Sequence, residues 1–381
     1  PDPLLSYRYY ARTPETRVGP QEHGLELSQA VPWKGKLGLE TERAERMAEN
    51  SLWGVRDLER ALVAELKRAW FDALYLREAL EVNAGERELL RGFEEIALTR
   101  YATGEGIQQD VVKVQTQISR RSDRELLLRR QLDVALRRMA ELTGRPGSEV
   151  ILGAAAPELP RLSIDESSLE EQAGDGHPLV RAAESRIAAE ESWARQRELE
   201  GRPDFRFGLG YTLVGEREDQ AGILNPPQDN GKDVLALMVG VNLPLHRKKI
   251  RAGIAEAEQS ARSAGHALES TRDALSFAVQ DAVLRLESSA ERAELYREVI
   301  VPQAEESLAS AEAAYTTGRQ GFLDLLDAER VLFEARLAHR RLVADGWIAA
   351  ADLERALGRA FPGAAESGGS PPRTGTEGAQ P

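Results

Sequence analysis

Four segments of the chain alternate apolar with small or polar residues at a period of two, which predicts β-strands. The segments are residues 4–11, 25–31, 205–213 and 235–243. Pro32 and Pro244 directly follow the second and fourth segments, and a proline cannot continue a central strand. We therefore expect two β-hairpins, one in each half of the chain, with loops over 13–21 and 215–232.

The remaining apolar positions recur with helical spacing. No proline interrupts residues 36–101, and at about 1.5 Å per residue such a helix would extend roughly 100 Å. Further helices are expected over 110–142, 179–199, 247–315 and 324–357, with a kink at Pro302. In the third of these, nine of ten positions spaced alternately by four and three residues, from Ile250 to Ala282, are apolar. That spacing is typical of a coiled-coil seam.

The motif Tyr-x-x-Gly-x5-Asp occurs twice, with an offset of 214 residues and no gap. The first copy begins at Tyr101 and the second at Tyr315. Each is predicted to be the tip of a helical hairpin, because Gly104 and Gly318 suit the left-handed conformation that closes a helix. The offset falls to 212 at the prolines that end the β-hairpins, so about two residues are inserted between hairpin and tip in the second half.

The aspartate of each motif falls in the first turn of the following helix. There a carboxylate accepts free backbone N–H groups and meets the positive end of the helix dipole. The residues expected at the N-cap positions are Ile107 and Gly321. Glycine is a fair N-cap, but isoleucine has no side-chain acceptor, so the first cap is expected to lack a side-chain hydrogen bond or to shift by one residue.

Composition narrows the function classes. The 381 residues are 30% charged and only 6% aromatic, which favours long helices in bundles or coiled coils. The net charge is −13 without a basic patch, which argues against nucleic-acid binding. No cysteine is present, and the five histidines have no ligand spacing, so no metal site, cofactor or enzymatic motif is expected. We expect no signal peptide or transmembrane helix in this sequence, and we interpret Pro1 as a processed or truncated end.

Four strands alone leave open sheet edges. One face of the two later strands is continuously apolar, and the other face carries small and polar residues. This pattern is typical of a barrel wall with lipid outside and water inside, and closing such a lumen requires strands from several copies. The alternative is a small β-sandwich or a sheet covered by the helices.

The order of elements resembles that of the TolC family of outer-membrane efflux channels. Each half of the chain has a strand hairpin, a helix of about 65 residues, the tip motif, a second helix and a Pro-rich connector. Asn-Leu-Pro-Leu at 242–245, before a basic helix start, and Gly-Arg-Pro-Asp at 201–204 are similar to the branch that serves heavy-metal and drug efflux pumps. The resemblance implies a mainly α fold with a four-stranded antiparallel β part, long duplicated helical hairpins and a TolC-like trimeric α/β barrel. Three copies would form a twelve-stranded barrel and a twelve-helix periplasmic tunnel.

The resemblance also implies functional residues. Asp324 and Asp327 match the acidic ring that narrows the periplasmic aperture, and Lys113 replaces the second acid in the first tip. Asp324 has the alternative role of a helix-start carboxylate, and the two roles are compatible. The hairpin tips are expected to contact an adaptor protein; their residues are Tyr101, Gly104, Asp110, Tyr315 and Gly318.

The domain boundaries expected on this basis follow the repeat. They are a first β-hairpin over 1–33, a first long helical hairpin over 34–144, an equatorial connector and helix over 145–202, a second β-hairpin over 203–245, a second long helical hairpin over 246–360 and a disordered tail over 361–381. The family's helix before the first strand has its counterpart in residues 179–199 but none in the first half, so we expect a cut chain or a fragment.

The expected function is that of an outer-membrane channel subunit of a tripartite efflux pump, a passive conduit for small molecules or metal ions. No enzymatic activity and no cofactor are expected. The implied partners are two further copies in a homotrimer, a periplasmic adaptor, an inner-membrane pump and outer-membrane lipid, with no nucleic acid. The alternative is a periplasmic coiled-coil adaptor or scaffold protein of an export system. Adaptors have one helical hairpin, whereas this sequence predicts two.

Overall fold

The structure, a computed structural model, describes residues 1–145, 152, 159 and 176–359. Most of the expected connector after Arg145 and the whole of the expected tail over 361–381 lie outside the described residues. The chain divides into two compact units. The first comprises residues 1–52 and 182–269, and the second comprises 53–181 and 270–381.

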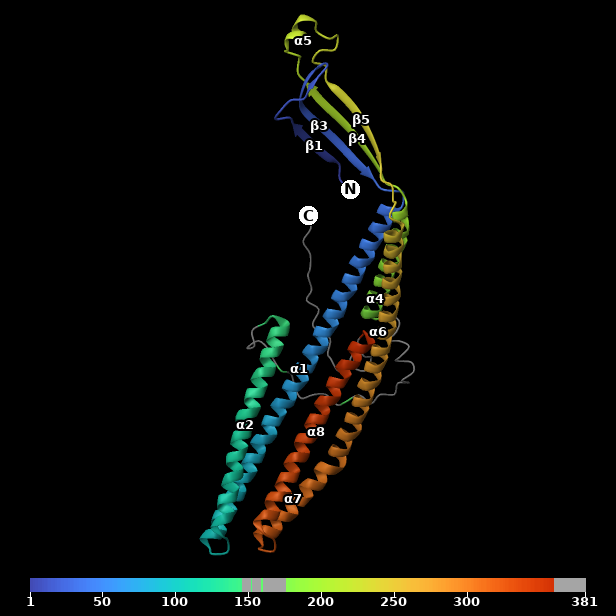
Figure 1. Cartoon of the computed structure of the whole chain (residues 1–381). Coiled ribbons are helices and arrows are strands. Elements are labelled where there is room, and N and C mark those ends of the chain that lie inside the picture. Colours follow the sequence, from blue (N-terminus) through green and yellow to red (C-terminus); the bar gives the residue numbers. More distant parts are fainter. Residues whose placement is uncertain (146–151, 153–158, 160–175, 360–381) are drawn as a thin grey trace, which may run out of the picture. The chain divides into compact units, whose positions relative to one another are not determined.

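The first unit contains an antiparallel sheet in the order β1-β3-β4-β5 (Figure 1). Its strands are β1 (Leu4–Tyr9), β3 (Gly19–Val31), β4 (Phe205–Val214) and β5 (Val234–Val241). All four predicted strands are present, but β3 begins six residues before the predicted start at Leu25, so the loop predicted over 13–21 is wrong for residues 19–21. Two short elements were not expected in the loops: β2 (Glu15–Thr16), which pairs with the early part of β3, and α5 (Gln220–Leu224), which Asp219 caps by accepting the Gly222 N–H at 3.1 Å.

The strand register separates the sheet into two chemically different faces. Leu27, Leu209 and Leu237 are paired across β3, β4 and β5, and the neighbouring row is Ser28, Gly208 and Met238. The apolar face is open, since Leu237 is 85% exposed. The alternative of a β-sandwich or a helix-covered sheet is therefore wrong for the described residues.

Asp204 fastens the base of the sheet to the start of the first long helix. Its carboxylate accepts hydrogen bonds from the Trp33 backbone N–H at 2.8 Å and from the Lys36 ammonium at 2.7 Å. Its carbonyl oxygen accepts from the Asn242 N–H at 2.9 Å, and Trp33 stacks on Phe205. Asp204, the last residue of the Gly-Arg-Pro-Asp segment, thus connects the end of β3, the start of α1 and the end of β5.

The predicted helices are confirmed to within two residues at most ends. They are α1 (Lys36–Ala102), α2 (Gln108–Thr143), α4 (Pro178–Glu198) with a 3₁₀ turn η2 (Leu199–Gly201), α6 (Arg247–Leu295), α7 (Val301–Thr316) and α8 (Phe322–Leu357). None of the helices in the described part of the chain combines the length and apolarity that crossing a membrane requires.

A π-helical turn, η3 (Tyr296–Ile300), separates α6 from α7. Pro302, where the sequence predicts a kink, lies in the first turn of α7 directly after it. A π turn bonds residue i to i+5 and so holds one more residue than an α turn. It therefore accounts for one of the two residues inserted in the second half of the chain.

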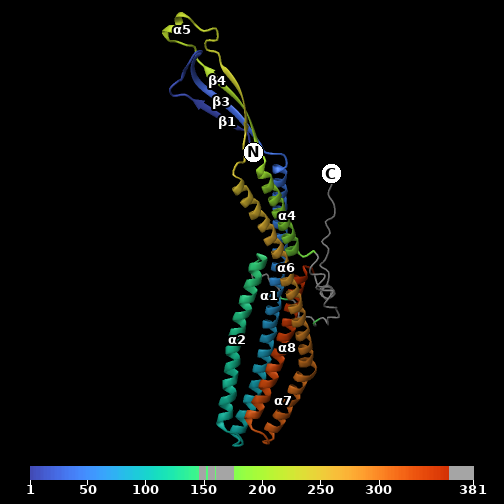
Figure 2. The same ribbon diagram turned by 45° about the vertical axis from the view of Figure 1, so that its right-hand side comes forward.

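The long helices of the second unit lie side by side in Figure 2. They pack through a core that includes several alanines. Near the tips, Leu90 and Phe93 of α1 meet Val114 of α2 and Leu325 of α8, all with at most 1% of their surface exposed. Further from the tips, Phe71 of α1 stacks on Trp347 of α8 with ring centroids 5.4 Å apart. These contacts place α1 of the first hairpin against α8 of the second.

Candidate functional site

The two hairpin tips have the backbone that the repeated motif predicts. Gly104 and Gly318 have φ values of 79° and 72°, in the left-handed region that other residues rarely occupy. At the first tip, the N–H groups of Glu105 and Gly106 both bond to the Arg100 carbonyl at 2.9 Å, which satisfies the end of α1.

The helices that leave the tips begin differently. Ile107 is the N-cap residue of α2 and makes no side-chain capping bond, as expected. At the second tip, the Asp324 carboxylate accepts the N–H of the N-cap residue Gly321 at 3.2 Å. Asp324 therefore has the helix-start role that the sequence allowed, and this contact also holds its carboxylate at the mouth of the tip.

Arg100 of α1 ties the first tip to the second. It donates to the carbonyl oxygen of Tyr315, and its guanidinium lies 4.8 Å from the centre of the Tyr315 ring. Tyr315 is only 3% exposed, whereas its counterpart Tyr101 is 49% exposed. Burial and the charge of Asp110 raise the pKa of the Tyr315 hydroxyl, while Arg100 acts in the opposite direction. The predicted residues Asp110 and Tyr315 are thus brought near each other.

Asp324 and Asp327 lie one turn apart on α8, and both are exposed. Asp327 forms an ion pair with Arg330 at 2.6 Å, which neutralises part of its charge. No group of three metal-binding side chains occurs among the residues that the structure describes. A single copy of the chain therefore offers two acids at this tip, both open to a neighbour or to solvent.

A buried acid cluster lies between the two hairpins, and sequence reasoning missed it. Glu86 of α1 and Glu329 of α8 are each 2% exposed. Arg121 of α2 binds Glu329 at 3.1 Å and stacks over Phe333. No described group donates to either oxygen of Glu86. Burial, together with the hydrogen bond and charge of Glu329, raises the pKa of Glu86 to about 9. At neutral pH the Glu86 carboxyl is therefore protonated, which avoids the repulsion between two buried carboxylates.

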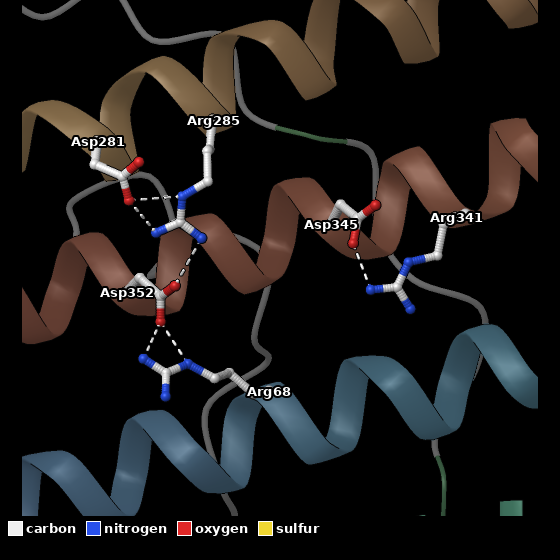
Figure 3. Close-up of polar contacts among 6 residues, drawn as sticks. All are labelled: Arg68, Asp281, Arg285, Arg341, Asp345 and Asp352. Atoms are coloured by element: carbon white, nitrogen blue, oxygen red, sulfur yellow. Dashed lines mark hydrogen bonds and ion pairs between the residues drawn. The ribbon is translucent and has the colours of Figure 1, made fainter. Parts of the chain in front are cut away.

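An ion network holds α8 between α1 and α6 further along the bundle (Figure 3). Asp352 of α8 accepts from Arg68 of α1 and, at 3.0 Å, from Arg285 of α6. Arg285 also pairs with Asp281 one turn earlier, at 2.9 Å. Arg341 of α8 reaches Asp72 of α1 at 2.7 Å. The contact between α1 and α8, which we call the α1–α8 seam, thus combines ion pairs with the apolar contact of Phe71 and Trp347.

Comparison with known proteins gives the arrangement its context. Residues 169–359 match the family model described as outer membrane efflux protein. The chain is 23% identical over 355 residues to the cobalt-zinc-cadmium resistance protein CzcC of Cupriavidus metallidurans, covering 91% of this chain and 79% of that protein.

Solved structures share the fold. A membrane protein from Pseudomonas aeruginosa superimposes with a TM-score of 0.78 at 20% identity, over 95% of this chain and 82% of that one. The outer membrane protein VceC of Vibrio cholerae does so with a TM-score of 0.75 at 16% identity, over 94% and 86%.

Channels of this family are trimers that act with an adaptor and an inner-membrane pump, and they are not enzymes. The fold of a single-hairpin adaptor or a soluble scaffold does not fit, since two long hairpins and an open sheet are present. The family model covers half of the sequence and the fold agrees along nearly all of it. The chain therefore belongs to the outer membrane efflux protein family and is an outer-membrane channel subunit with a periplasmic helical part.

Proposed function

We propose that three copies of this chain form a passive conduit for divalent metal cations. The open sheet is the observation that carries the trimeric part of the proposal. In one copy β1 and β5 are both edge strands, and the apolar row ending in Leu237 has nothing to cover it. Three copies joined edge to edge remove the open edges, with lipid against the apolar face and water against the row of Ser28 and Gly208.

Two observations support cations as the transported species: the acidic residues of the second tip and the name of one relative. Three copies of Asp324 and Asp327 bring six carboxylates to one opening, a ring that attracts cations and repels anions. The relative CzcC is named for resistance to cobalt, zinc and cadmium. The capping contact of Asp324 fixes one carboxylate of each copy, and Arg330 limits the charge of the other.

The conduit itself supplies no energy. The sequence contains no nucleotide-binding motif, so an inner-membrane pump and an adaptor are proposed to load the channel. The adaptor is proposed to contact the tips around Gly104 and Gly318. Exposed Tyr101 offers an aromatic anchor there, a residue type that protein interfaces favour.

Conductance in planar bilayers tests the aperture. The variant Asp324→Ala/Asp327→Ala is expected to lose several-fold in cation-over-anion preference and in block by Co²⁺ or Zn²⁺. Glu334→Ala, an exposed acid two turns further along α8, is the matched control and should leave both values unchanged. Unaltered block and selectivity in the double variant would overturn the aperture assignment.

Adaptor contact is tested separately, and the absence of native cysteine makes this direct. A photo-crosslinker attached at Tyr101→Cys should capture the adaptor in cells that express the whole pump. The same label at Glu88→Cys, an exposed site whose native side chain is 74% accessible on α1, should not. Equal capture at both sites would contradict docking at the tips.

A further inference from the structure

The contact between α1 and α8 joins the first half of the chain to the second half. Its ionic members are Arg68 with Asp352 and Lys67 with Glu354, and its apolar members include Phe71 and Trp347. Because the chain is a repeat, helix α6 is the counterpart of α1, and α2 is the counterpart of α8. In one copy, no contact between α6 and α2 is described.

The repeat identifies the counterpart of each seam residue. Beyond the π turn the offset is 214, so Asp352 corresponds to Arg138 of α2. Before the π turn the offset is 213, because that turn holds one extra residue, so Arg68 corresponds to Asp281 of α6. The ion pair Arg68–Asp352 thus has a counterpart pair, Asp281 and Arg138, with both charges inverted.

The apolar neighbours agree with this mapping. Ala64 and Phe71 are 4% and 8% exposed in the α1–α8 seam. Their counterparts on α6 are Phe277 and Leu284, which are 70% and 60% exposed and flank Asp281 on one helix face. On the other side of the seam, Ile348 of α8 packs against the core, whereas its counterpart Val134 on α2 is 58% exposed.

Asp281 and Arg138 each have a local ion-pair partner and still expose part of the side chain. Asp352 bonds to Arg285 within its own hairpin and to Arg68 across the seam. Arg138 likewise bonds to Glu65 of its own hairpin, and its side chain is 42% exposed. Asp281 pairs with Arg285 on its own helix and is 46% exposed. Each has its local partner and retains exposed surface for a second.

We propose that the α6 face of Phe277, Asp281 and Leu284 docks on the α2 face of Val134 and Arg138 of a second copy of this chain, with Asp281 and Arg138 forming an ion pair between copies. The occupant is a second copy because a closed ring of alternating halves repeats one seam, and within the chain that seam is already built. This proposal rests on the proposed trimer.

Within one copy, Arg138 pairs with Glu65 and Glu141, and Asp281 pairs with Arg285. Further from the tips, the described ion pairs run from α2 to α1, from α1 to α8 and from α8 to α6, and near the tips Arg121 of α2 also binds Glu329 of α8. Figure 3 shows the pairs from α1 to α8 and from α8 to α6, with Asp352 between Arg68 and Arg285. None of these described contacts joins α2 to α6, and the exposed residues on the two faces are available to another molecule.

Cysteine crosslinking tests the pairing in a chain that has no native cysteine. The variant Asp281→Cys/Arg138→Cys, treated with a short bismaleimide after assembly in detergent, should give covalent dimers and trimers on a denaturing gel. Asp281→Cys/Arg120→Cys is the control, since Arg120 is on the same helix about 27 Å away and its counterpart Glu334 is exposed. The control should stay monomeric on the gel.

Charge reversal provides the second arm. Asp281→Arg and Arg138→Asp should each raise the monomer fraction on dilution by about tenfold, because like charges then meet at every seam of the ring. The double variant Asp281→Arg/Arg138→Asp should restore the trimer, and Arg120→Glu should have no effect. Rescue by the double variant is not expected if the single changes only damage the monomer.

The outcomes separate the two proposals. A trimeric channel in which the cysteine pair does not crosslink, or in which the double charge reversal fails to rescue, overturns this seam and leaves the conduit intact. A protein that forms no trimer under any condition overturns both.

Discussion

Arg100 and Tyr315, which lie in the last turns of α1 and α7 and are 215 positions apart, are joined at the hairpin tips. The guanidinium lies over the tyrosine ring and donates to the carbonyl oxygen of the same residue. One side chain thus adds a second hydrogen bond to a carbonyl at the end of α7, which also accepts the Gly318 N–H at 3.0 Å, and covers the buried ring beside it. The two tips of one copy are expected to move together.

Replacing Arg100 by alanine should release this link. A hydrogen bond from a charged donor and the ring contact are both lost, and we expect a decrease of about 1–2 kcal/mol in the free energy of unfolding. In single-channel recordings the variant should show more frequent open events. Arg91→Ala, which breaks only the exposed pair with Glu88, is the control. Identical recordings for the two variants would contradict a coupling of the tips through Arg100.

The buried acid pair predicts an unusual dependence on pH. The pKa of Glu86 is raised from 4.5 to about 9, so the folded chain binds one more proton than the unfolded chain between these values. Stability from this group is complete below pH 4.5 and is lost as the pH rises, by up to about 1.4 kcal/mol per unit. Glu86→Gln, which keeps a donor towards Glu329, should flatten the curve and stabilise the protein at pH 8.

Urea titrations across pH 5–9 measure that slope. Glu81→Gln, an exposed acid on the same helix, should leave it unchanged. A wild-type slope that persists in Glu86→Gln would show that the proton is bound elsewhere.

His177 predicts the opposite behaviour on the acid side. Its Nδ1 accepts the Leu179 N–H at 3.1 Å, so Nε2 carries the proton and donates to the Arg355 carbonyl at 3.1 Å. Burial lowers the pKa of this imidazole. A second proton on the ring would have to bind Nδ1, which faces the Leu179 N–H donor. The free energy of unfolding is therefore expected to fall as the pH drops below about 6.5. His177→Asn keeps an acceptor at the start of α4 and should remove this acid-side loss.

Thermal melts at pH 7.5 and 5.5 measure the effect of His177. His266→Asn, at an exposed site on α6, is the control and should melt as the wild type does at both values. If the wild type melts at the same temperature at both pH values, the neutral capping role of His177 is wrong.

Asp352 is the central acid of the network in Figure 3. Asp352→Asn leaves Arg68 and Arg285 facing each other without a carboxylate between them. Since this side chain is 15% exposed, we expect a loss of about 2 kcal/mol in unfolding free energy, below the cost of breaking a fully buried pair. Denaturant unfolding checks the value. Glu88→Gln, in an exposed pair, should cost less than about 1 kcal/mol.

The sequence predicted the elements well because their signals are local. A period of two over ten residues, or a helical seam of several turns, does not depend on distant partners. The left-handed glycines at 104 and 318 and the missing side-chain cap at Ile107 follow from the same local chemistry. The short elements β2 and α5 were missed because two and five residues carry no period.

The buried pair of Glu86 and Glu329 was beyond reach for a different reason. Both residues sit in charged stretches, where an acid is ordinarily solvated. Which faces of α1 and α8 meet depends on packing between helices about 240 residues apart. The roles of Asp324 and Asp327 as an aperture remain a prediction, since an opening exists only between copies.

The π turn at Tyr296–Ile300 also determines where the chain can lose or gain a residue. An added residue in a regular α-helix would swing every later side chain by about 100° and turn the buried stripe towards solvent. Here the extra residue is accommodated within the five positions of the π turn, so the helices on either side of it, α6 and α7, keep their buried faces in register. Deleting one residue from this stretch should therefore convert the bulge into ordinary helix, whereas the same deletion a few turns away should scramble the tip.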